Sequence, residues 1–588
     1  MSGLGRANRL EDAEMLSTAG ASGPVVEEIW GAPAPEILAR ALRARSGFFF
    51  LDTARPEEIT GRAFSFMGFN PFLTWRAKHD QIVTESKEGR EEVRGDPWEH
   101  LRALMNRYAC ASAAEIPFPG GAVGYFGYEF GARSAGVASV AADDPDLPDA
   151  QFSFYDGLLA FDHSVGKTYA VANPIATRST EEILTELREA VSSLSGERCL
   201  GGARPPGALA DPGASPEPTA AGASVPGLPA EALAKVGGRA PPNLPRLVAQ
   251  TAVICGQLKP NDQDDVRPLQ PQTQSPPEDH HEHINPGAAP KTQSQSPSPP
   301  DDITVNAQSP GDNLRSNLTR AEYLERIGRA QAYIAAGDIY QVNLAQRFEL
   351  TLREDPFEIY ERLRRLNPAA FAAYLDLGST QILSSSPELL ARIDARRAVV
   401  TRPIKGTRPR GQNPTEDRQL AAELAASEKD QAELLMIVDL LRNDLGRVCQ
   451  FGSVRVAERA RLESHPTVFH LVATISGELK NDQDAFDCLR SLLPGGSITG
   501  APKIRAMQII AELEPDLRHV YTGSIGYLAF DGTCDFNIAI RTILCRAGQA
   551  SYHVGGAIVA DSDPESEYQE TLTKGRALRA ALLGKTQL

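Results

Sequence analysis

The sequence lacks several features that would place the protein in a specialised class. It has no run of Lys and Arg, and its formal net charge is −16. The chain therefore offers no basic surface for a nucleic acid or an anionic membrane. No stretch approaches the roughly eighteen uninterrupted apolar residues of a membrane-spanning helix, and the N-terminus lacks the apolar core of a signal peptide. We expect a cytoplasmic protein without nucleic-acid or membrane partners.

Cysteine is scarce, with 7 residues in a chain of 588, scattered from Cys110 to Cys545. No Cys-x-x-Cys pair occurs, which excludes a disulfide framework and the usual spacing of zinc ligands. The sequence also has no internal repeat of fixed period. These absences leave an ordinary globular protein with reduced thiols.

The composition that is present fits this class, with 41% hydrophobic and 23% charged residues. We divide the chain into a flexible N-terminal tail (1–22), a globular region (23–198), a Pro/Ser/Gln-rich low-complexity linker or insertion (199–316) and a second globular region (317–588). The insertion has too few aromatic residues to bury much apolar surface. Within it we expect one short helix at 244–258, and we interpret the histidines around 280–283 as solvated.

Regular elements resume after residue 318. Thr319 is predicted to cap a helix that ends near Gly337. Strands are predicted at 339–351 and 375–393, and helices at 427–445, 503–513 and 564–583. The last helix has Asp563 and Pro564 in the positions preferred for an N-cap and a first-turn residue.

A basic turn at 401–411 contains Arg402, Lys405, Arg408 and Arg410 between prolines and glycines. A lone lysine in a turn is usually solvated, because its ammonium group is costly to bury. The turn therefore indicates a function only in combination with other segments of the sequence.

Five such segments occur in order: Asp338-Ile-Tyr-Gln341-Val-Asn, Ser386-Pro-Glu388, Glu433 to Asp444, Gly495-Gly-Ser497-Ile-Thr499-Gly-Ala-Pro-Lys503, and Glu567-Tyr-Gln-Glu570. Together they resemble the chorismate-utilising enzyme family. The resemblance implies an α+β fold, a large β/α/β sandwich of two antiparallel sheets with outer helices, built from both halves of the chain. It makes 317–588 the chorismate-binding catalytic domain.

Lys405 is the discriminating residue in this resemblance. Members of the anthranilate synthase type have alanine in the turn, whereas aminodeoxychorismate synthases have lysine. An amine that occupies C2 of chorismate leaves C4 as the position for ammonia. Such an amine must be uncharged, and we expect burial beside Arg402 or Arg408 to lower its pKa. The alternative is a Lys405 that only contacts a substrate carboxylate.

Two further residues concern proton transfer. Relatives that add water have a lysine base where this chain has Gln341, and glutamine cannot take a proton from water near neutral pH. This predicts a user of ammonia. Glu388 resembles the general acid of the family, and the serines at 384–386 before it are interpreted as an edge strand that opens on a cleft.

Three carboxylates are candidates for a Mg²⁺ site. Glu567 and Glu570 are three residues apart on a predicted helix and project to the same side. Glu433 lies on another helix and completes the set that the resemblance implies. Mg²⁺ prefers such oxygen ligands and commonly keeps waters or substrate oxygens as well.

The remaining substrate-binding residues follow from the resemblance. Arg541 is assigned to the enolpyruvyl carboxylate together with Tyr527 and the backbone of Gly555 and Gly556. The other predicted contacts are Gln341, Thr407, His470, Ser497, Thr499 and Lys503. One departure from the family pattern is Ala557, which stands where a third glycine is expected.

Ammonia needs a source, and no cysteine lies in the Gly-x-Cys-x-Gly setting of a glutamine amidotransferase. The resemblance therefore implies a separate amidotransferase subunit as partner. The predicted reaction converts chorismate and ammonia to 4-amino-4-deoxychorismate, on the route to p-aminobenzoate and folate. Two alternatives stay open: an anthranilate synthase component I, and an inactive scaffold that only binds a partner or ligand.

Overall fold

The computed structural model describes residues 23–54, 63–112, 116–139, 141, 143–195, 314–465 and 468–587. These residues form one compact unit with contributions from both sides of the insertion. The helix predicted at 244–258 and the histidines around 280–283 lie outside the described residues.

The first of two large sheets combines strands from both halves of the chain, and every recorded pairing in it is antiparallel. Its order is β1 (Val25–Ile29), β10 (Lys167–Ala172), β9 (Gly157–Asp162), β3 (Phe64–Gly68), β2 (Phe49–Asp52), β13 (Phe371–Asp376), β14 (Thr380–Ser386), β23 (Thr542–Arg546), β24 (Gln549–Ile558), β12 (Gln341–Thr351) and β11 (Arg315–Ser316), with β20 (Gly500–Ala501) also paired to β12. The junction of the two halves is the pairing of β2 with β13.

The second sheet is built in the same way, with β21 and β7 as the strands that join the halves. Its order is β17 (Ile404–Pro409), β19 (Val468–Glu478), β16 (Ala398–Arg402), β15 (Leu389–Ile393), β22 (Cys534–Asn537), β21 (Ser524–Ala529), β7 (Gly121–Phe126), β8 (Ala150–Tyr155), β4 (Leu73–Lys78), β5 (Gln81–Ser86) and β6 (Gly89–Arg94), with β18 (Arg455–Ser464) paired to β19. This arrangement of two antiparallel sheets confirms the predicted fold class.

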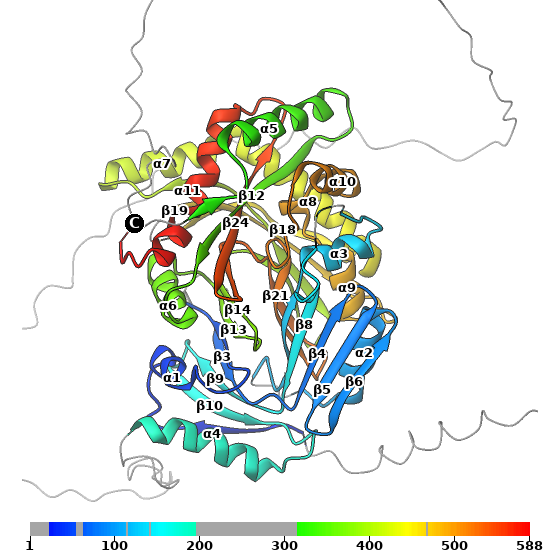
Figure 1. Cartoon of the computed structure of the whole chain (residues 1–588), viewed down its shortest axis with the longest axis vertical. Helices are drawn as coiled ribbons and strands as arrows, with labels where there is room; N and C mark the ends of the chain where they lie inside the picture. The colour runs from blue at the N-terminus through cyan, green and yellow to red at the C-terminus, as the bar shows by residue number, and fades with distance from the viewer. Residues whose placement is uncertain are drawn as a thin grey trace, which may run out of the picture. The chain divides into compact units, whose positions relative to one another are not determined.

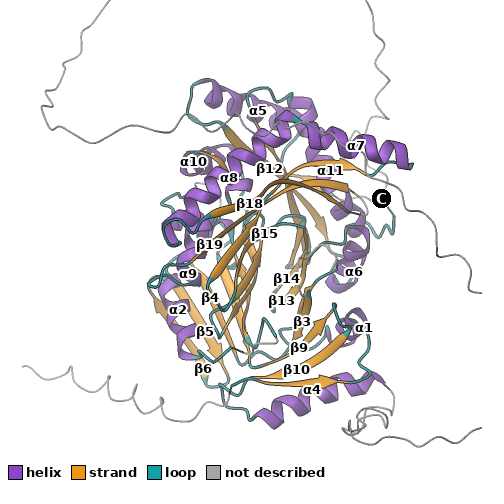
Figure 2. Cartoon of the chain, turned by 180° about the vertical axis from the view of Figure 1, so that it is seen from behind, coloured by secondary structure: helices purple, strands orange, loops and turns teal. Residues whose placement is uncertain are grey.

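Helices cover the outside of the two sheets (Figures 1 and 2). They are α1 (Pro35–Leu42), α2 (Pro97–Arg107), α3 (Tyr128–Ser134), α4 (Thr180–Ser195), α5 (Arg320–Ala335), α6 (Pro356–Leu366), α7 (Pro414–Ala426), α8 (Glu428–Val448), α9 (Ala485–Leu492), α10 (Lys503–Leu513) and α11 (Pro564–Leu582), with a 3₁₀ turn η2 (Gly496–Ile498). None of the helices among the described residues has the length and apolar character needed to cross a bilayer.

An aromatic core fills part of the space between the sheets. Phe49, Phe66, Phe118 and Tyr527 belong to this buried cluster, with Phe118 and Tyr527 stacked at 4.3 Å between ring centroids. Separate apolar clusters lie under the helices, for example where α8 and α9 cover the second sheet. Burial of such large rings is the main favourable contribution to a sandwich of this kind.

Two of the connections between the sheets lie next to each other. Pro387 and Glu388 link β14 of the first sheet to β15 of the second, and the segment from Ile538 to Arg541 links β22 to β23 in the opposite direction. Ile538 N donates to Glu388 O at 3.0 Å, so these connections touch. Glu388, at one crossing, is buried, and Arg541, at the other, lines a cavity.

The structure contains the predicted helix caps. Thr319 accepts from the backbone N–H of Glu322, and the Glu322 carboxylate accepts from the N–H of Thr319, which forms a capping box at α5. Asp563 caps α11 in front of Pro564, and Ser427 caps α8. Helix α10 spans the predicted residues, while β12 begins two residues later than predicted because Ile339 and Tyr340 precede the ladder.

Loss of the α5 cap gives a test of this description. We expect Thr319→Ala to lower the free energy of unfolding by about 1 kcal/mol, because N–H groups at the helix start lose their acceptor. Urea denaturation followed by circular dichroism measures the change. Thr573→Ala, on the exposed face of α11, is the control and should change stability by less than about 0.5 kcal/mol. Equal effects of the two variants would contradict the capping role.

Candidate active site

Lys405, Ser497 and Glu388 are joined in one hydrogen-bonded group. Lys405 is the second residue of β17, and its Nζ donates to the carbonyl oxygen of Ser497 at 3.1 Å. The hydroxyl of Ser497, in η2, donates to Oε1 of Glu388 at 2.7 Å. The 3₁₀ turn η2 therefore brings Ser497 next to Lys405 and Glu388, which lie 92 and 109 positions earlier in the sequence.

Burial changes the proton affinity of both ionisable members. It raises the pKa of Glu388, although the Ser497 hydroxyl and the nearby Lys405 oppose this. Burial also lowers the pKa of Lys405, and Glu433 and Glu388 oppose that shift. An amine and an acid with pKa values displaced toward their neutral forms are suited to nucleophilic attack and to proton donation.

Lys574, which sequence reasoning missed, is a second lysine in this group. It lowers the pKa of Lys405 through its positive charge. Its Nζ forms an ion pair with Glu570 at 2.6 Å and donates to Gly555 O at 3.0 Å. The signal was present in the sequence, since Lys574 follows Glu570 by four residues and so lies one turn further along α11.

The segment 401–411, predicted as a turn, instead forms the end of β16 and all of β17, and its arginines have a different role from the one expected. Arg402 forms an ion pair with Glu463, and Arg408 pairs with Glu423 and Asp430. Each guanidinium is thus balanced by a carboxylate, and the cation that lowers the pKa of Lys405 is Lys574. The expectation that Arg402 or Arg408 would do so is wrong.

The three predicted metal ligands surround this group from two helices. Glu433 of α8 interacts electrostatically with Lys405 and Glu570, and burial raises its pKa. On α11, the side chains of Glu567 and Glu570 lie against Gly556 of β24. A Cβ atom added to Gly556 would be 3.2 Å from Glu567 Oε2 and 3.8 Å from Glu570 Oε1. The same-side projection predicted for these two carboxylates is confirmed.

These carboxylates differ in their proton affinity. Burial raises the pKa of Glu567, whose Oε1 accepts from the hydroxyl of Ser562 at 2.7 Å. Burial acts in the same direction on Glu570, but the Lys574 ion pair outweighs it and leaves the pKa lowered. Within the described ranges, no three His, Cys, Asp or Glu side chains are grouped so as to hold a metal ion by themselves. The oxygen donors fit Mg²⁺ chemically, provided that a ligand or waters supply the remaining oxygens.

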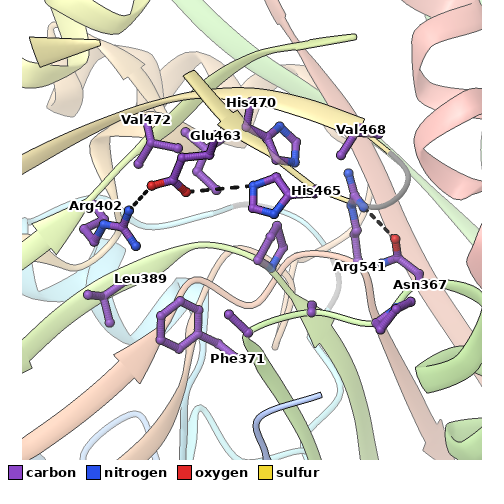
Figure 3. A pocket seen from close by; sticks show the side chains of 15 residues that line it. Asn367, Phe371, Leu389, Arg402, Glu463, His465, Val468, His470, Val472 and Arg541 are labelled. Carbon is purple, nitrogen blue, oxygen red and sulfur yellow. Dashed lines mark hydrogen bonds and ion pairs between the residues drawn. The ribbon is translucent and has the colours of Figure 1, made fainter. Parts of the chain in front are cut away.

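A cavity beside the sheet crossings contains two more of the predicted residues (Figure 3). His470 and Arg541 line it, together with Pro387, Leu389 and Ile404, which flank Glu388 and Lys405 in sequence. Arg541 has a left-handed backbone with φ of 51°, and its guanidinium donates to Asn367 Oδ1 at 2.8 Å. Thr407 Oγ1 lies 2.9 Å from His470 Nδ1. This cavity thus presents a cation and an imidazole next to the Lys405 group.

Another histidine lies on the same cavity wall. His465 packs at 5.1 Å from His470 between ring centroids, and its Nε2 is 3.8 Å from Glu463 Oε2. Figure 3 shows Arg402, Glu463 and His465 along one side and Arg541 with Asn367 on the other. Charged groups of both signs therefore face this cavity.

Gln341 and Thr499 lie at the start of β12 and beside β20. The Gln341 side chain is fully buried, and neither its amide nitrogen nor its amide oxygen has a hydrogen-bond partner. Thr499 O accepts from Asn343 N at 2.9 Å, which fixes η2 against β12. A buried amide without a partner is costly unless a ligand or water satisfies it, and this supports a polar ligand near Gln341.

Two predicted residues are engaged elsewhere. Tyr527 faces a separate cavity of about 630 Å³ lined also by Leu51, Asp52 and Thr53, and its hydroxyl donates to Pro117 O at 3.5 Å. The Lys503 ammonium forms an ion pair with Asp444 at 2.6 Å and donates to three carbonyl groups at the end of α9. Their predicted contacts with substrate stay predictions, without support from this arrangement.

The serines before Glu388 do not form an edge. β14 lies between β13 and β23, and Ser384, Ser385 and Ser386 are buried. Their hydroxyls bond within the protein, for example Ser386 to Ile538 O at 2.6 Å. The interpretation as an edge strand is wrong, because the site opens where the chain crosses between sheets.

Comparison with known proteins assigns the class. The chorismate binding enzyme family matches residues 47–221 and 257–580. The chain belongs to this family and is a chorismate-utilising enzyme.

The particular relatives are of two kinds. Aminodeoxychorismate synthase component 1 of Escherichia coli (strain K12) is 35% identical over 506 residues, which is 86% of each chain. Anthranilate synthase component 1 of Acetivibrio thermocellus is 32% identical over 562 residues, which is 95% of each. The crystal structure of anthranilate synthase component I from Streptococcus pneumoniae TIGR4 superposes with a TM-score of 0.62 at 26% identity, covering 89% of this chain and 93% of that one.

The charge of Lys574 provides a test of the site. Lys574→Met should raise the pKa of Lys405, because a cation that disfavours the ammonium form is removed. Competitive acylation of amines across pH, with mass spectrometry of the peptide that contains Lys405, measures this pKa. Lys87→Met, on the exposed β5–β6 turn, is the matched control and should leave the curve unchanged. An unchanged or lowered pKa in Lys574→Met would contradict the assigned coupling.

Proposed function

We propose that the chain replaces the 4-hydroxyl group of chorismate with an amino group from ammonia, which gives 4-amino-4-deoxychorismate. The observation that carries this proposal is the buried amine of Lys405, whose pKa is lowered and which is linked through Ser497 to the buried acid Glu388. An uncharged amine beside a protonated carboxyl group is the pair that two successive displacements require.

In the first displacement, the Lys405 nitrogen forms a bond to C2, the two conjugated ring double bonds shift, and the 4-hydroxyl leaves as water with a proton from Glu388. In the second, ammonia forms a bond to C4, the two double bonds shift back, the Lys405 amine leaves C2, and a proton from the attached ammonia returns to Glu388. The balance is chorismate and ammonia to 4-amino-4-deoxychorismate and water. Gln341 is consistent with this route, since its amide cannot act as the base that would activate water.

Substrate binding is assigned to the charged and polar groups around the cavity. Arg541 binds a substrate carboxylate, and His470, held by Thr407, contacts the ring. Glu433, Glu567 and Glu570 would hold Mg²⁺, which neutralises the ring carboxylate when bound. The lowered pKa of Glu570 keeps this carboxylate ionised for that purpose.

Ammonia is assigned to a separate glutamine amidotransferase subunit. The similar proteins are named component 1, which implies another component. The product would serve the synthesis of p-aminobenzoate and folate.

Anthranilate synthesis is the second candidate, and the relative of that name with 95% coverage favours it. The two candidates differ in where nitrogen enters the ring. Attack at C2 by ammonia, followed by loss of pyruvate, gives the ortho-amino acid. In the proposed reaction Lys405 occupies this carbon first, which favours the para position.

Product analysis separates the candidates. The purified chain should convert chorismate, in the presence of Mg²⁺ and ammonium, to a product that retains the enolpyruvyl group, as seen by chromatography with mass detection. EDTA should stop turnover, and added Mg²⁺ should restore it. Strong anthranilate fluorescence would overturn the proposal in favour of the second candidate, and complete inactivity at high ammonium would favour a non-catalytic scaffold.

Lys405→Met tests the covalent role. We expect turnover to fall by more than about 100-fold, equivalent to roughly 2.7 kcal/mol of transition-state stabilisation, while the Kd for chorismate changes by less than about threefold. Calorimetry and a steady-state assay give these values. With the unsubstituted chain and no ammonia, intact mass spectrometry should detect an adduct on Lys405. Lys480→Met, far from this group, serves as control, and undiminished turnover of Lys405→Met would remove the nucleophile.

A further inference from the structure

Arg518 is a buried cation outside the predicted site. It lies in the loop between α10 and β21, and only 1% of its surface is exposed. Burial of a guanidinium is costly unless every N–H group finds an acceptor. Burial alone would lower its pKa, but the adjacent Glu514 carboxylate outweighs this effect and raises it. The group is therefore a permanent charge within the protein.

All of its hydrogen-bonding capacity is used. Nε donates to Glu514 Oε2 at 2.8 Å, Nη2 to Glu514 Oε1 at 2.6 Å and to Asn343 O at 2.7 Å, and Nη1 to Ile498 O at 3.1 Å and to Thr522 Oγ1 at 3.3 Å. A planar guanidinium has five donors in a fixed geometry. Its acceptors are therefore held at defined positions relative to one another.

The acceptor with the most direct relation to the site is Ile498 O. Ile498 stands between Ser497 and Thr499 in the η2 segment. Ser497 O receives the bond from Lys405, and its hydroxyl binds Glu388. The bond from Arg518 to Ile498 O therefore fixes the short segment that joins the amine to the acid.

The other partners tie the same segment to its surroundings. Asn343 is two residues from Gln341 on β12, and its N–H donates to Thr499 O. Glu514 Oε1 accepts from Ala345 N at 2.8 Å, further along the same strand. The guanidinium thus links η2 to β12 as one rigid body around the site.

The N-terminal half holds the backbone of this arginine. Glu129 of α3 accepts from Arg518 N at 2.8 Å and from His519 N at 2.9 Å. Tyr128 places its ring 4.8 Å from the guanidinium carbon. Residues far from the motifs in sequence therefore contribute to the position of Arg518.

We propose that Arg518 is a positioning residue for the reaction at Lys405, acting through Ile498 O on Ser497. It does not touch the reacting atoms. It keeps Ser497 where one residue contacts both the nucleophile and the general acid, and small displacements of such groups are costly in rate. This inference rests on the proposed function only in so far as Lys405 and Glu388 carry the chemistry.

A double-mutant cycle tests the coupling. Arg518→Lys keeps the charge but cannot reach all the acceptors of the fork. We expect kcat for chorismate consumption with ammonium to fall by about 10-fold or more, with KM changed less than about threefold. Ser497→Ala, which removes the hydroxyl on Glu388, should then cost at least about threefold less in the Arg518→Lys background than in the unsubstituted chain.

The controls separate positioning from lost folding. If Arg518→Lys only lowered the folded fraction, Ser497→Ala would reduce kcat by the same factor in both backgrounds. Equal factors in the two backgrounds would therefore overturn the proposal. Chorismate-binding stoichiometry by calorimetry gives the active fraction. Arg505→Lys replaces the same residue type in an exposed ion pair with Asp338 and should leave kcat unchanged.

A second variant covers the case in which Arg518→Lys does not fold. Glu514→Gln leaves the arginine but removes its counter-charge. We expect a smaller loss of kcat than in Arg518→Lys, and Ser497→Ala should again cost less in this background than in the unsubstituted chain. Independence in this cycle would also overturn the proposal. Product identity is recorded separately: an anthranilate product refutes the proposed function, whereas the cycle reports on Arg518 whichever product forms.

Discussion

The proposed reaction requires Lys405 to hold an uncharged amine among carboxylates that favour its ammonium form. Glu433, Glu388 and Glu570 all raise its pKa, while burial and Lys574 lower it. In the proposed reaction only the neutral amine attacks carbon. The site therefore depends on a balance in which desolvation is the largest contribution, and desolvation requires the sheets and helices around it to stay packed.

The sandwich topology supplies this enclosure. Glu388 and Arg541 lie on connections that cross between the two sheets in opposite directions, and the contact between Ile538 and Glu388 joins them. At these crossings Arg541 lines the cavity, and Glu388 is buried beside Ser497. Both sheets need strands from the N-terminal half, since β13 pairs with β2 and β21 with β7.

Sequence reasoning succeeded where the signal is local. The caps at Thr319 and Asp563 and the shared face of Glu567 and Glu570 depend on residues within one or two helical turns, and the structure contains them. It failed where neighbours are distant in sequence. Ser384–Ser386 were interpreted as an edge strand. The sequence around them does not indicate that β23, which lies much later in the chain, pairs with β14.

The same limit explains the site residues. Arg402 and Arg408 are close to Lys405 in sequence, but their partners, Glu463 and Asp430, come from other elements. Arg518 lies outside the sequence segments that predicted the site, and its proposed role depends on hydrogen-bond acceptors on β12 and η2. Lys503 was predicted to contact substrate, but its ammonium group forms an ion pair with Asp444 of α8, which is distant in sequence.

Overall likeness does not choose between the two products. Relatives of both names align with most of this chain at 35% and 32% identity. In the proposed reaction the point of nitrogen entry depends on which ring carbon is occupied when ammonia arrives, and Lys405 of β17 is the side chain that occupies it. Function in such a family is therefore determined by the local environment of that side chain rather than by the scaffold. Here that environment includes the burial and neighbouring charges that shift the pKa of Lys405, together with its hydrogen bond to Ser497 O.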